Sequence, residues 1–259
     1  MIYKHNKPVT CLYSSKDYTL FFFDKGCEIW GTDTRTLNLP HKALGVYIKS
    51  NIIYYYTDVN VFSTTFTGDI VKLCSKETLD CIIFLENIFY LVNDKHVVIY
   101  NYRGEMTHSV NLIHKGVCVK GVYEDVLYLA FEDGSICYIQ KNKLTEIIKM
   151  DENITSFDVQ NQMMCIAYFY KKIAICDTKG ENFKYTEISF TPKIIKFWKE
   201  HITVLDEENN FFLLNQNLKI LYCENYENKL SFFEVQKDKL FLVMKSGTVI
   251  STDNITEYI

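Results

Sequence analysis

The sequence predicts an all-β fold, a seven-bladed β-propeller. A turn signal recurs seven times, and each time an apolar run ends at a polar turn before a second β-type run begins. The turns are Asp24-Lys25, Thr57-Asp58, Asp94-Lys95, Asp133-Gly134, Tyr170-Lys171, Glu207-Glu208 and Lys245-Ser246. Neighbouring copies lie roughly 33 to 39 residues apart, near the period of propeller blades. The 19 Tyr and 18 Phe favour strands over helices.

The composition excludes several classes of protein. The 259 residues suffice for one large all-β domain, and only 3 Pro and 10 Gly argue against a disordered or collagen-like chain. No signal-like apolar run follows Met1, and none is long enough to span a membrane, so we expect a soluble cytoplasmic protein without a membrane partner. The nine cysteines form no C-x-x-C pair. Those in apolar runs are expected to be buried reduced thiols: Cys11, Cys81, Cys118 and Cys165.

Each repeat is expected to form four short strands. In the fourth repeat these are residues 116–122, 126–131, 135–140 and 144–149, and in the fifth they are 154–159, 163–170, 173–177 and 184–188. The second and third runs are almost continuously apolar, which is typical of strands covered on both faces. The first and fourth runs alternate more, as expected for strands near a central channel and at the rim.

The repeats divide the chain into blades within a single domain. The expected blades are residues 5–40, 41–77, 78–113, 114–150, 151–189, 190–227 and 228–259. No four-stranded unit buries both faces alone, so the ring must close. We expect residues 1–4 to close it beside the seventh blade, with residues 254–259 as the alternative. A two-sheet β-sandwich array is the other possible fold, but seven even repeats make it the weaker prediction.

Two histidines occupy equivalent positions in their repeats. His5 precedes Asp24 by nineteen residues, and His114 precedes Asp133 by the same number. WD-type repeats pair such a His with the Asp of the central turn, and an aromatic residue such as Trp30 covers the pair. We therefore assign structural roles to His5, Asp24, Trp30, His114 and Asp133, because buried polar groups need partners. The alternative is a catalytic or metal-binding pair, but the spacing supplies no third or fourth ligand, so no metal or cofactor is expected.

The charge is unevenly distributed. Residues 1–50 hold seven basic and four acidic side chains, a net charge of +3, whereas the whole chain carries −4. The first blade and the segment that leaves it are therefore expected to form a basic edge that can attract an anionic partner. The chain has only two arginines, Arg35 and Arg103, so phosphate contacts would come mostly from lysine.

The first blade also resembles a known family. It contains His5-Asn6-Lys7-Pro8-Val9-Thr10-Cys11, then Asp24-Lys25 and Ile29-Trp30, and then Leu39-Pro40-His41-Lys42-Ala43-Leu44. This pattern resembles the receptor for activated protein C kinase family, the seven-bladed WD-repeat scaffolds of the eukaryotic small ribosomal subunit. Residues 98–104 look like the end of that family's third blade. Phe23 departs from the pattern, because the family has an arginine there that contacts RNA.

The resemblance implies a non-enzymatic scaffold docked on the head of the small ribosomal subunit. Its partners would be ribosomal RNA, ribosomal proteins, and signalling or translation factors, with no small-molecule substrate. The residues expected to contact ribosomal RNA through phosphates are Lys4, Lys7, Lys25, Arg35, Lys42 and Lys49.

Two other functions stay open. The chain could be a propeller subunit of another assembly, such as the i subunit of translation initiation factor three, or a coat or nuclear-pore propeller. An enzyme is the third possibility. The expected channel strands contain Val9-Thr10-Cys11, Val117-Cys118-Val119 and Ile154-Thr155-Ser156, which supply no convergent acid, base and nucleophile. The sequence contains no G-x-G-x-x-G, G-x-S-x-G or H-E-x-x-H motif.

Overall fold

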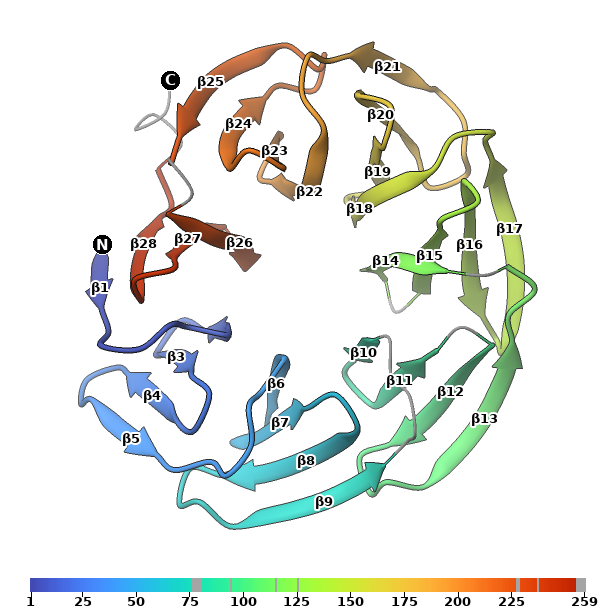
Figure 1. The fold of residues 1–259 in the computed structure, drawn as a ribbon. Helices are drawn as coiled ribbons and strands as arrows, with labels where there is room; N and C mark the ends of the chain where they lie inside the picture. The colour runs from blue at the N-terminus through green and yellow to red at the C-terminus, as the bar shows by residue number, and fades with distance from the viewer. Residues whose placement is uncertain are drawn as a thin grey trace. The chain divides into compact units, whose positions relative to one another are not determined.

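The computed structural model describes residues 1–75, 81–93, 95–114, 116–124, 126–226, 229–236 and 238–254. Within these residues every regular element is a β-strand, and the strands form seven four-stranded antiparallel sheets (Figure 1). The fold is therefore a seven-bladed β-propeller, as the sequence predicts. The turn residue Asp94 and the side chains of Cys81 and Cys118 lie outside the described part of the structure.

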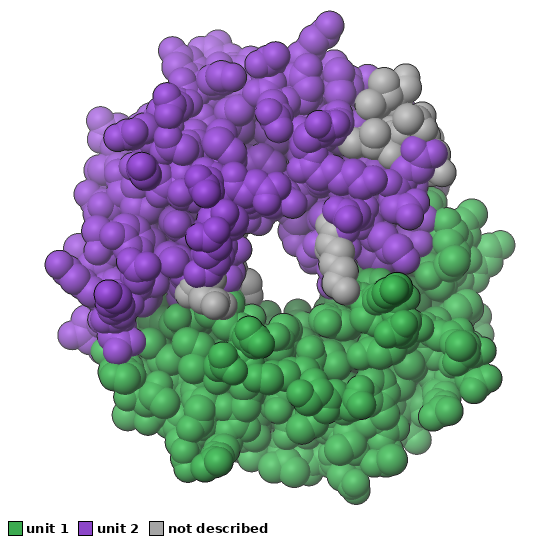
Figure 2. All heavy atoms as spheres, turned by 180° about the vertical axis from the view of Figure 1, so that it is seen from behind, with its two compact units in different colours: residues 1–93, 97–109, 243–250 green, residues 94–96, 110–242, 251–259 purple. Residues whose placement is uncertain are grey.

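The chain divides into two compact units, which Figure 2 colours separately. Unit 1 holds residues 1–93, 97–109 and 243–250, and unit 2 holds residues 94–96, 110–242 and 251–259. A single domain stays a prediction from the sequence.

Unit 1 contains three sheets in which the strands follow chain order. Their strands are β2 (Cys11–Ser14), β3 (Thr19–Phe22), β4 (Cys27–Trp30) and β5 (Arg35–Leu37); β6 (Gly45–Lys49), β7 (Ile52–Tyr56), β8 (Asn60–Thr65) and β9 (Ile70–Ser75); and β10 (Cys81–Phe84), β11 (Ile88–Val92), β12 (His96–Asn101) and β13 (Met106–Asn111).

Unit 2 contains three more sheets of the same kind. Their strands are β14 (Val117–Tyr123), β15 (Val126–Phe131), β16 (Ser135–Gln140) and β17 (Lys143–Lys149); β18 (Ile154–Gln160), β19 (Met163–Tyr168), β20 (Lys172–Asp177) and β21 (Lys184–Glu187); and β22 (Pro192–Trp198), β23 (His201–Asp206), β24 (Asn210–Leu214) and β25 (Ile220–Asn225).

The seventh sheet combines the two ends of the chain. Its strands are β26 (Leu230–Gln236), β27 (Lys239–Met244), β28 (Thr248–Thr252) and β1 (Ile2–Lys4), in the order β1-β28-β27-β26. Strand β1 pairs antiparallel with β28, with Tyr3 opposite Val249 (Figure 1). Residues 2–4 thus form the outer strand of this sheet, while Ile255–Ile259 lie outside the described residues.

The hydrophobic core lies between neighbouring sheets. In unit 1, Leu20 and Phe22 of β3 pack with Ile53, Tyr55 and Phe62 of the next sheet, and all are buried. All four residues of β3 are buried because its two faces are both covered. Removing a large apolar side chain from water contributes about 1.5–3 kcal/mol, which favours stacked sheets over isolated ones.

The strand boundaries follow the turn chemistry of the sequence. The expected strands 126–131 and 135–140 coincide with β15 and β16. The expected strand 163–170 is too long: β19 ends at Tyr168, and Phe169 and Tyr170 are exposed in a turn. Lys171 in that turn has a φ of 57°, a left-handed conformation that ends the strand.

Candidate functional site

Four of the lysines expected to bind RNA lie at one end of the first sheet and its neighbours. In an antiparallel sheet, the loop leading into β2, the β3–β4 turn and the loop leaving β5 all lie at the same end. Lys7 lies in the first of these segments, Lys25 in the second and Lys42 in the third, while Lys4 ends β1. All four are exposed, and none forms an ion pair with another described residue.

Backbone contacts bring a fifth lysine to this end. Gly247, in the β27–β28 turn, accepts a hydrogen bond from the His5 backbone N–H at 3.3 Å, so that turn lies against the loop containing Lys7. Lys245 in the same turn is exposed, and within the described residues it has no ion-pair partner. We call Lys4, Lys7, Lys25, Lys42 and Lys245 the lysine end.

The sequence missed Lys245, because the pairing of β1 with β28 brings it close from the far end of the chain. Exposed Asp24 and Asp58, in the β3–β4 and β7–β8 turns of unit 1, lie at the same ends of their sheets. Basic side chains outnumber acidic ones there, so the lysine end keeps a positive charge.

The other two expected RNA contacts lie at the opposite end of their sheets, so the six residues do not form one edge. Arg35 follows the β4–β5 turn and pairs with Asp33 at 3.9 Å. Lys49 ends β6 at the β6–β7 turn, where its Nζ donates to the Glu86 carbonyl and to Asn87 Oδ1 at 3.1 Å. The sequence grouped these residues by charge alone, whereas strand direction separates them.

His5 has a different partner from the one expected. Its Nδ1 lies 2.9 Å from Glu28 Oε2, and Trp30 Nε1 donates to the same oxygen at 3.1 Å. Asp24, the expected partner, is exposed in the β3–β4 turn, so the His5–Asp24 pairing is wrong. Glu28 lies on β4, and the rings of Phe21, Phe23 and Trp30 pack against the His5 ring with centroids 4.5–5.6 Å away.

His114 and Asp133 do pair in the fourth repeat. His114 Nδ1 lies 3.0 Å from Asp133 Oδ2, and Lys149 Nζ lies 2.8 Å from the same oxygen. Burial opposes ionisation of Asp133, but hydrogen bonds from Lys149, the Ser135 backbone and His114 outweigh it and hold the pKa of this carboxyl well below its usual range.

The structure gathers further metal-binding side chains around His114, which the sequence spacing did not show. Ligand atoms of His114, Cys137 and Glu146 all lie within 4.8 Å of one another. Cys137 and Glu146 are directly opposite each other on β16 and β17, next to an irregularity in the pairing.

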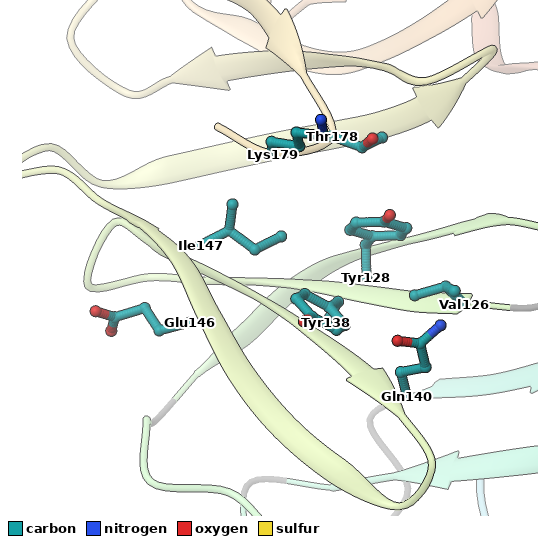
Figure 3. Close-up of a pocket in the computed structure, with 8 residues that line it drawn as sticks. All are labelled: Val126, Tyr128, Tyr138, Gln140, Glu146, Ile147, Thr178 and Lys179. Carbon is teal, nitrogen blue, oxygen red and sulfur yellow. The ribbon is translucent and has the colours of Figure 1, made fainter. Parts of the chain in front are cut away.

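A pocket of about 460 Å³ lies in unit 2, between the fourth sheet and the turn after β20 (Figure 3). Apolar or aromatic and polar side chains line it in equal number: Val126, Tyr128, Tyr138 and Ile147, and Gln140, Glu146, Thr178 and Lys179. The rings of Tyr128 and Tyr138 are 6.2 Å apart, and Thr178 and Lys179 lie across the cavity from Tyr138 and Gln140.

Ionisable residues on the first strands of unit 2 were also missed by the sequence analysis. Asp158 of β18 accepts a hydrogen bond from the Phe197 N–H of β22 at 2.8 Å, and Lys196 of β22 pairs with Glu234 of β26 at 2.5 Å. Burial raises the pKa of Asp158 to about 6, although Lys196 opposes the shift. These contacts join neighbouring sheets, so the three charged residues have a structural role.

Comparison with known proteins finds similar structures but no similar sequences. No known protein family matches the sequence, and no curated protein matches it either. The WD40 β-propeller domain of Doa1 is similar in structure, with a TM-score of 0.76 and 11% identity over 100% of this chain and 97% of that domain. BBS1N, solved in complex with ARL6DN, gives a TM-score of 0.75 and 9% identity over 96% of this chain and 91% of its own.

The computationally designed Ika8 protein is also similar, with a TM-score of 0.68 and 14% identity over 99% of this chain and 98% of its own. At such low identity these likenesses show the fold alone, which is a WD40-like β-propeller. The resemblance of the first blade to the receptor for activated protein C kinase family stays a prediction. Within the described residues, no helix has the length and apolar character needed to cross a membrane.

Proposed function

We propose that the chain is a non-enzymatic scaffold that docks on the small ribosomal subunit through RNA contacts of the lysine end. The observation that carries the proposal is five exposed lysines, each from a different strand end, loop or turn, all without ion pairs among the described residues. Unpaired lysines attract phosphate at little cost, because no salt bridge must be broken first. The resemblance of the first blade supports the choice of ribosomal RNA.

The chemistry of lysine suits docking rather than sequence recognition. Lysine is a flexible point charge that contacts phosphates without reading bases, whereas arginine makes directional paired hydrogen bonds. Arg35 lies at the opposite end of the sheet and is paired with Asp33. The lysine end is therefore expected to hold the scaffold on structured RNA irrespective of base sequence.

The remaining surface is proposed to receive proteins. BBS1N was solved in complex with ARL6DN, so a propeller of this general form can bind a protein partner. In this chain the pocket of unit 2 combines the rings of Tyr128 and Tyr138 with polar side chains that include Gln140 and Lys179. Tyrosine is enriched at protein-binding sites, where polar groups accompany it. Asp158, Lys196 and Glu234 join strands to one another, which supports a role without catalysis.

The test compares two double variants with the same change of charge. Lys25→Glu with Lys42→Glu reverses the lysine end, and Lys16→Glu with Arg35→Glu reverses two exposed residues at the opposite end of the first sheet. We measure how much of each variant co-sediments with purified small subunits. The reduction in co-sedimentation should be at least tenfold larger for the first variant than for the second. Equal losses, or none, would contradict docking through the lysine end.

The identity of the native partners is tested separately. Purification of the native protein should recover small-subunit RNA. Recovery of initiation-factor or coat subunits without ribosomal RNA would instead support the alternative propeller assemblies.

A further inference from the structure

The strongest unassigned group in the structure surrounds His114. The histidine side chain is 12% exposed and lies between two carboxylates, with Asp133 Oδ2 3.0 Å from Nδ1 and Glu146 Oε2 3.1 Å from Nε2. The Cys137 thiol is fully buried beside them. Nitrogen, sulfur and oxygen ligands are thus brought together by three segments: the loop before β14, β16 and β17.

The hydrogen bonds of Asp133 fix which nitrogen of His114 carries a proton. The Asp133 carboxylate accepts hydrogen bonds from the Ser135 backbone N–H at 3.0 Å and from Lys149 Nζ. An ionised carboxylate can only accept, so Nδ1 of His114 must donate its proton to it. A carboxylate that binds one ring nitrogen in this way orients a metal-binding histidine, because it leaves the lone pair on the other nitrogen.

The second nitrogen has no satisfactory protein partner. Nε2 of His114 is buried and forms no hydrogen bond of acceptable geometry within the described residues, although Glu146 Oε2 is only 3.1 Å away. A lone pair facing a carboxylate oxygen is repulsive, and a proton on Nε2 would not be aligned with that oxygen for a normal hydrogen bond. A cation bound by both groups would remove the repulsion.

The third ligand comes from the register of β16 and β17. Cys137 pairs directly with Glu146, next to a shift in register between Ile136 and Cys137. Such irregularities redirect side chains and recur beside functional sites. Zn²⁺ accepts cysteine sulfur, histidine nitrogen and carboxylate oxygen together, whereas Mg²⁺ and Ca²⁺ prefer oxygen alone.

We propose that His114, Cys137 and Glu146 bind one Zn²⁺ ion, with Asp133 positioning the histidine. Binding releases the thiol proton of Cys137 to solvent and leaves the fourth position for water or a partner's ligand. Glu146 also borders the pocket of about 460 Å³, but its carboxylate points away from Tyr128 and Tyr138 (Figure 3). The ion would cross-link the fourth sheet to the loop before it.

The experiment titrates the metal-free protein with ZnCl₂ against a chromogenic chelator, and with Co²⁺ as a spectroscopic probe. We expect one Zn²⁺ per chain, a thiolate-to-cobalt absorption band, and a rise in Tm of a few degrees (roughly 2–4 °C) on adding Zn²⁺. Glu146→Gln should weaken zinc binding at least tenfold. Asp133→Asn should weaken it by about 10- to 100-fold, the usual effect of removing a partner of a metal-binding histidine.

The cysteine variants separate this site from adventitious binding. Cys137→Ser should abolish the cobalt band, whereas Cys176→Ser, which changes another buried free cysteine, should keep both the band and the affinity. Glu146 is 43% exposed, so Glu146→Gln decides the question if Cys137→Ser does not fold. Absence of stoichiometric zinc binding, or equal binding by wild type and Glu146→Gln, would overturn the proposal.

Discussion

Single residues decide which polar groups pair inside the blades. His5 and His114 occupy equivalent sequence positions, yet His5 contacts Glu28 while His114 contacts Asp133. In the first blade, Glu28 also accepts from half-buried Trp30, so one carboxylate oxygen contacts both His5 and Trp30. In the fourth blade, Lys149 and Ser135 hold Asp133 in place for the histidine. The neighbouring side chains, not the spacing, select the partner.

Removal of Glu28 tests this difference. Glu28→Ala leaves buried His5 and Trp30 without their shared acceptor, so we expect it to lower the free energy of unfolding by about 1–3 kcal/mol. The matched change Asp24→Ala, at the partner that the spacing predicted, should cost about 0.5 kcal/mol or less because Asp24 is exposed. Urea denaturation of both variants measures the two values. Similar losses for the two variants would contradict the observed pairing.

Asp158 should make stability depend on pH. Its pKa is about 6 in the folded protein and near 3.9 in an unfolded chain, so between these values the folded protein binds more protons. The contribution of Asp158 is therefore greatest below about pH 4 and is lost as the pH rises through about 6.

Asp158→Asn should remove this pH dependence while keeping an oxygen that accepts from the Phe197 N–H. The stability of the variant relative to wild type should rise by about 2 kcal/mol between pH 4 and pH 7, since a shift of one pKa unit corresponds to about 1.4 kcal/mol. Urea denaturation across this range checks it. A difference that stays constant with pH would show that Asp158 does not carry the effect.

At the scale of strands, side chains connect the first strands of neighbouring sheets to one another. Ser156 Oγ accepts from the Ile195 N–H at 2.9 Å, and Thr155 Oγ1 donates to the Pro192 carbonyl at 3.0 Å. Strands β18 and β22 belong to different sheets and are not paired through their backbones. Together with the Asp158 contact, these side chains of β18 therefore provide hydrogen-bond partners for backbone groups of β22. Buried backbone donors need such partners.

Turns set where the strands end. Gly134, in the β15–β16 turn, is the glycine with the least room for a side chain. It has a φ of 83°, and a Cβ there would collide with the carbonyl oxygens of Met150 and Glu152. Gly134→Ala should therefore lower the free energy of unfolding by about 1–3 kcal/mol, because both the backbone conformation and the contact are unfavourable.

Thermal unfolding measures the effect, with Gly31→Ala as the control. Gly31 has no positive φ, and its added Cβ would lie 3.1 Å from the Asp17 carbonyl oxygen. The control should lose less stability than Gly134→Ala. A larger loss at Gly31 would contradict the role of the left-handed conformation.

At the scale of the whole molecule, the chain is acidic, but residues 1–50 carry a net charge of +3. The net charge is −4, yet the lysine end gathers five lysines from residues 4–42 and from residue 245. Local charge governs contact with a polyanion, because charges farther than about 10 Å away are screened at ordinary ionic strength. An acidic protein can therefore bind RNA through one surface.

The salt dependence of RNA binding measures this contribution. Each lysine–phosphate contact steepens the slope of log K against log salt concentration by about 0.7–0.9, so Lys25→Ala with Lys42→Ala should make the slope shallower by roughly 1.4–1.8. Lys16→Ala with Arg35→Ala, at the opposite sheet end, should leave it unchanged. Fluorescence anisotropy with a small-subunit RNA fragment at several salt concentrations gives both slopes. Equal slopes for the two variants would contradict the assignment of the lysine end.

The sequence predicted the repeats better than the sites. The continuous apolar run at residues 126–131 predicted a strand that is covered on both faces, and β15 has these bounds. The polar turn Asp133-Gly134 marked the break between this strand and the next, and Gly134 has a positive φ there. The expected RNA contacts depended instead on which end of a strand each charge occupies. Arg35 and Lys49 were grouped with Lys25 although they lie at the opposite ends of their sheets.

By itself, the order of residues determined seven four-stranded repeats and a cationic segment over residues 1–50, because periodicity and charge are local properties of a chain. Only the tertiary structure showed that the turn containing Lys245 lies against the loop containing Lys7, and that His5 pairs with Glu28. It also showed that Cys137 and Glu146 lie close to His114. These contacts depend on strand register and on the pairing of β1 with β28, which join residues far apart in sequence. Distance along the chain carries no information about such neighbours until the strands are paired.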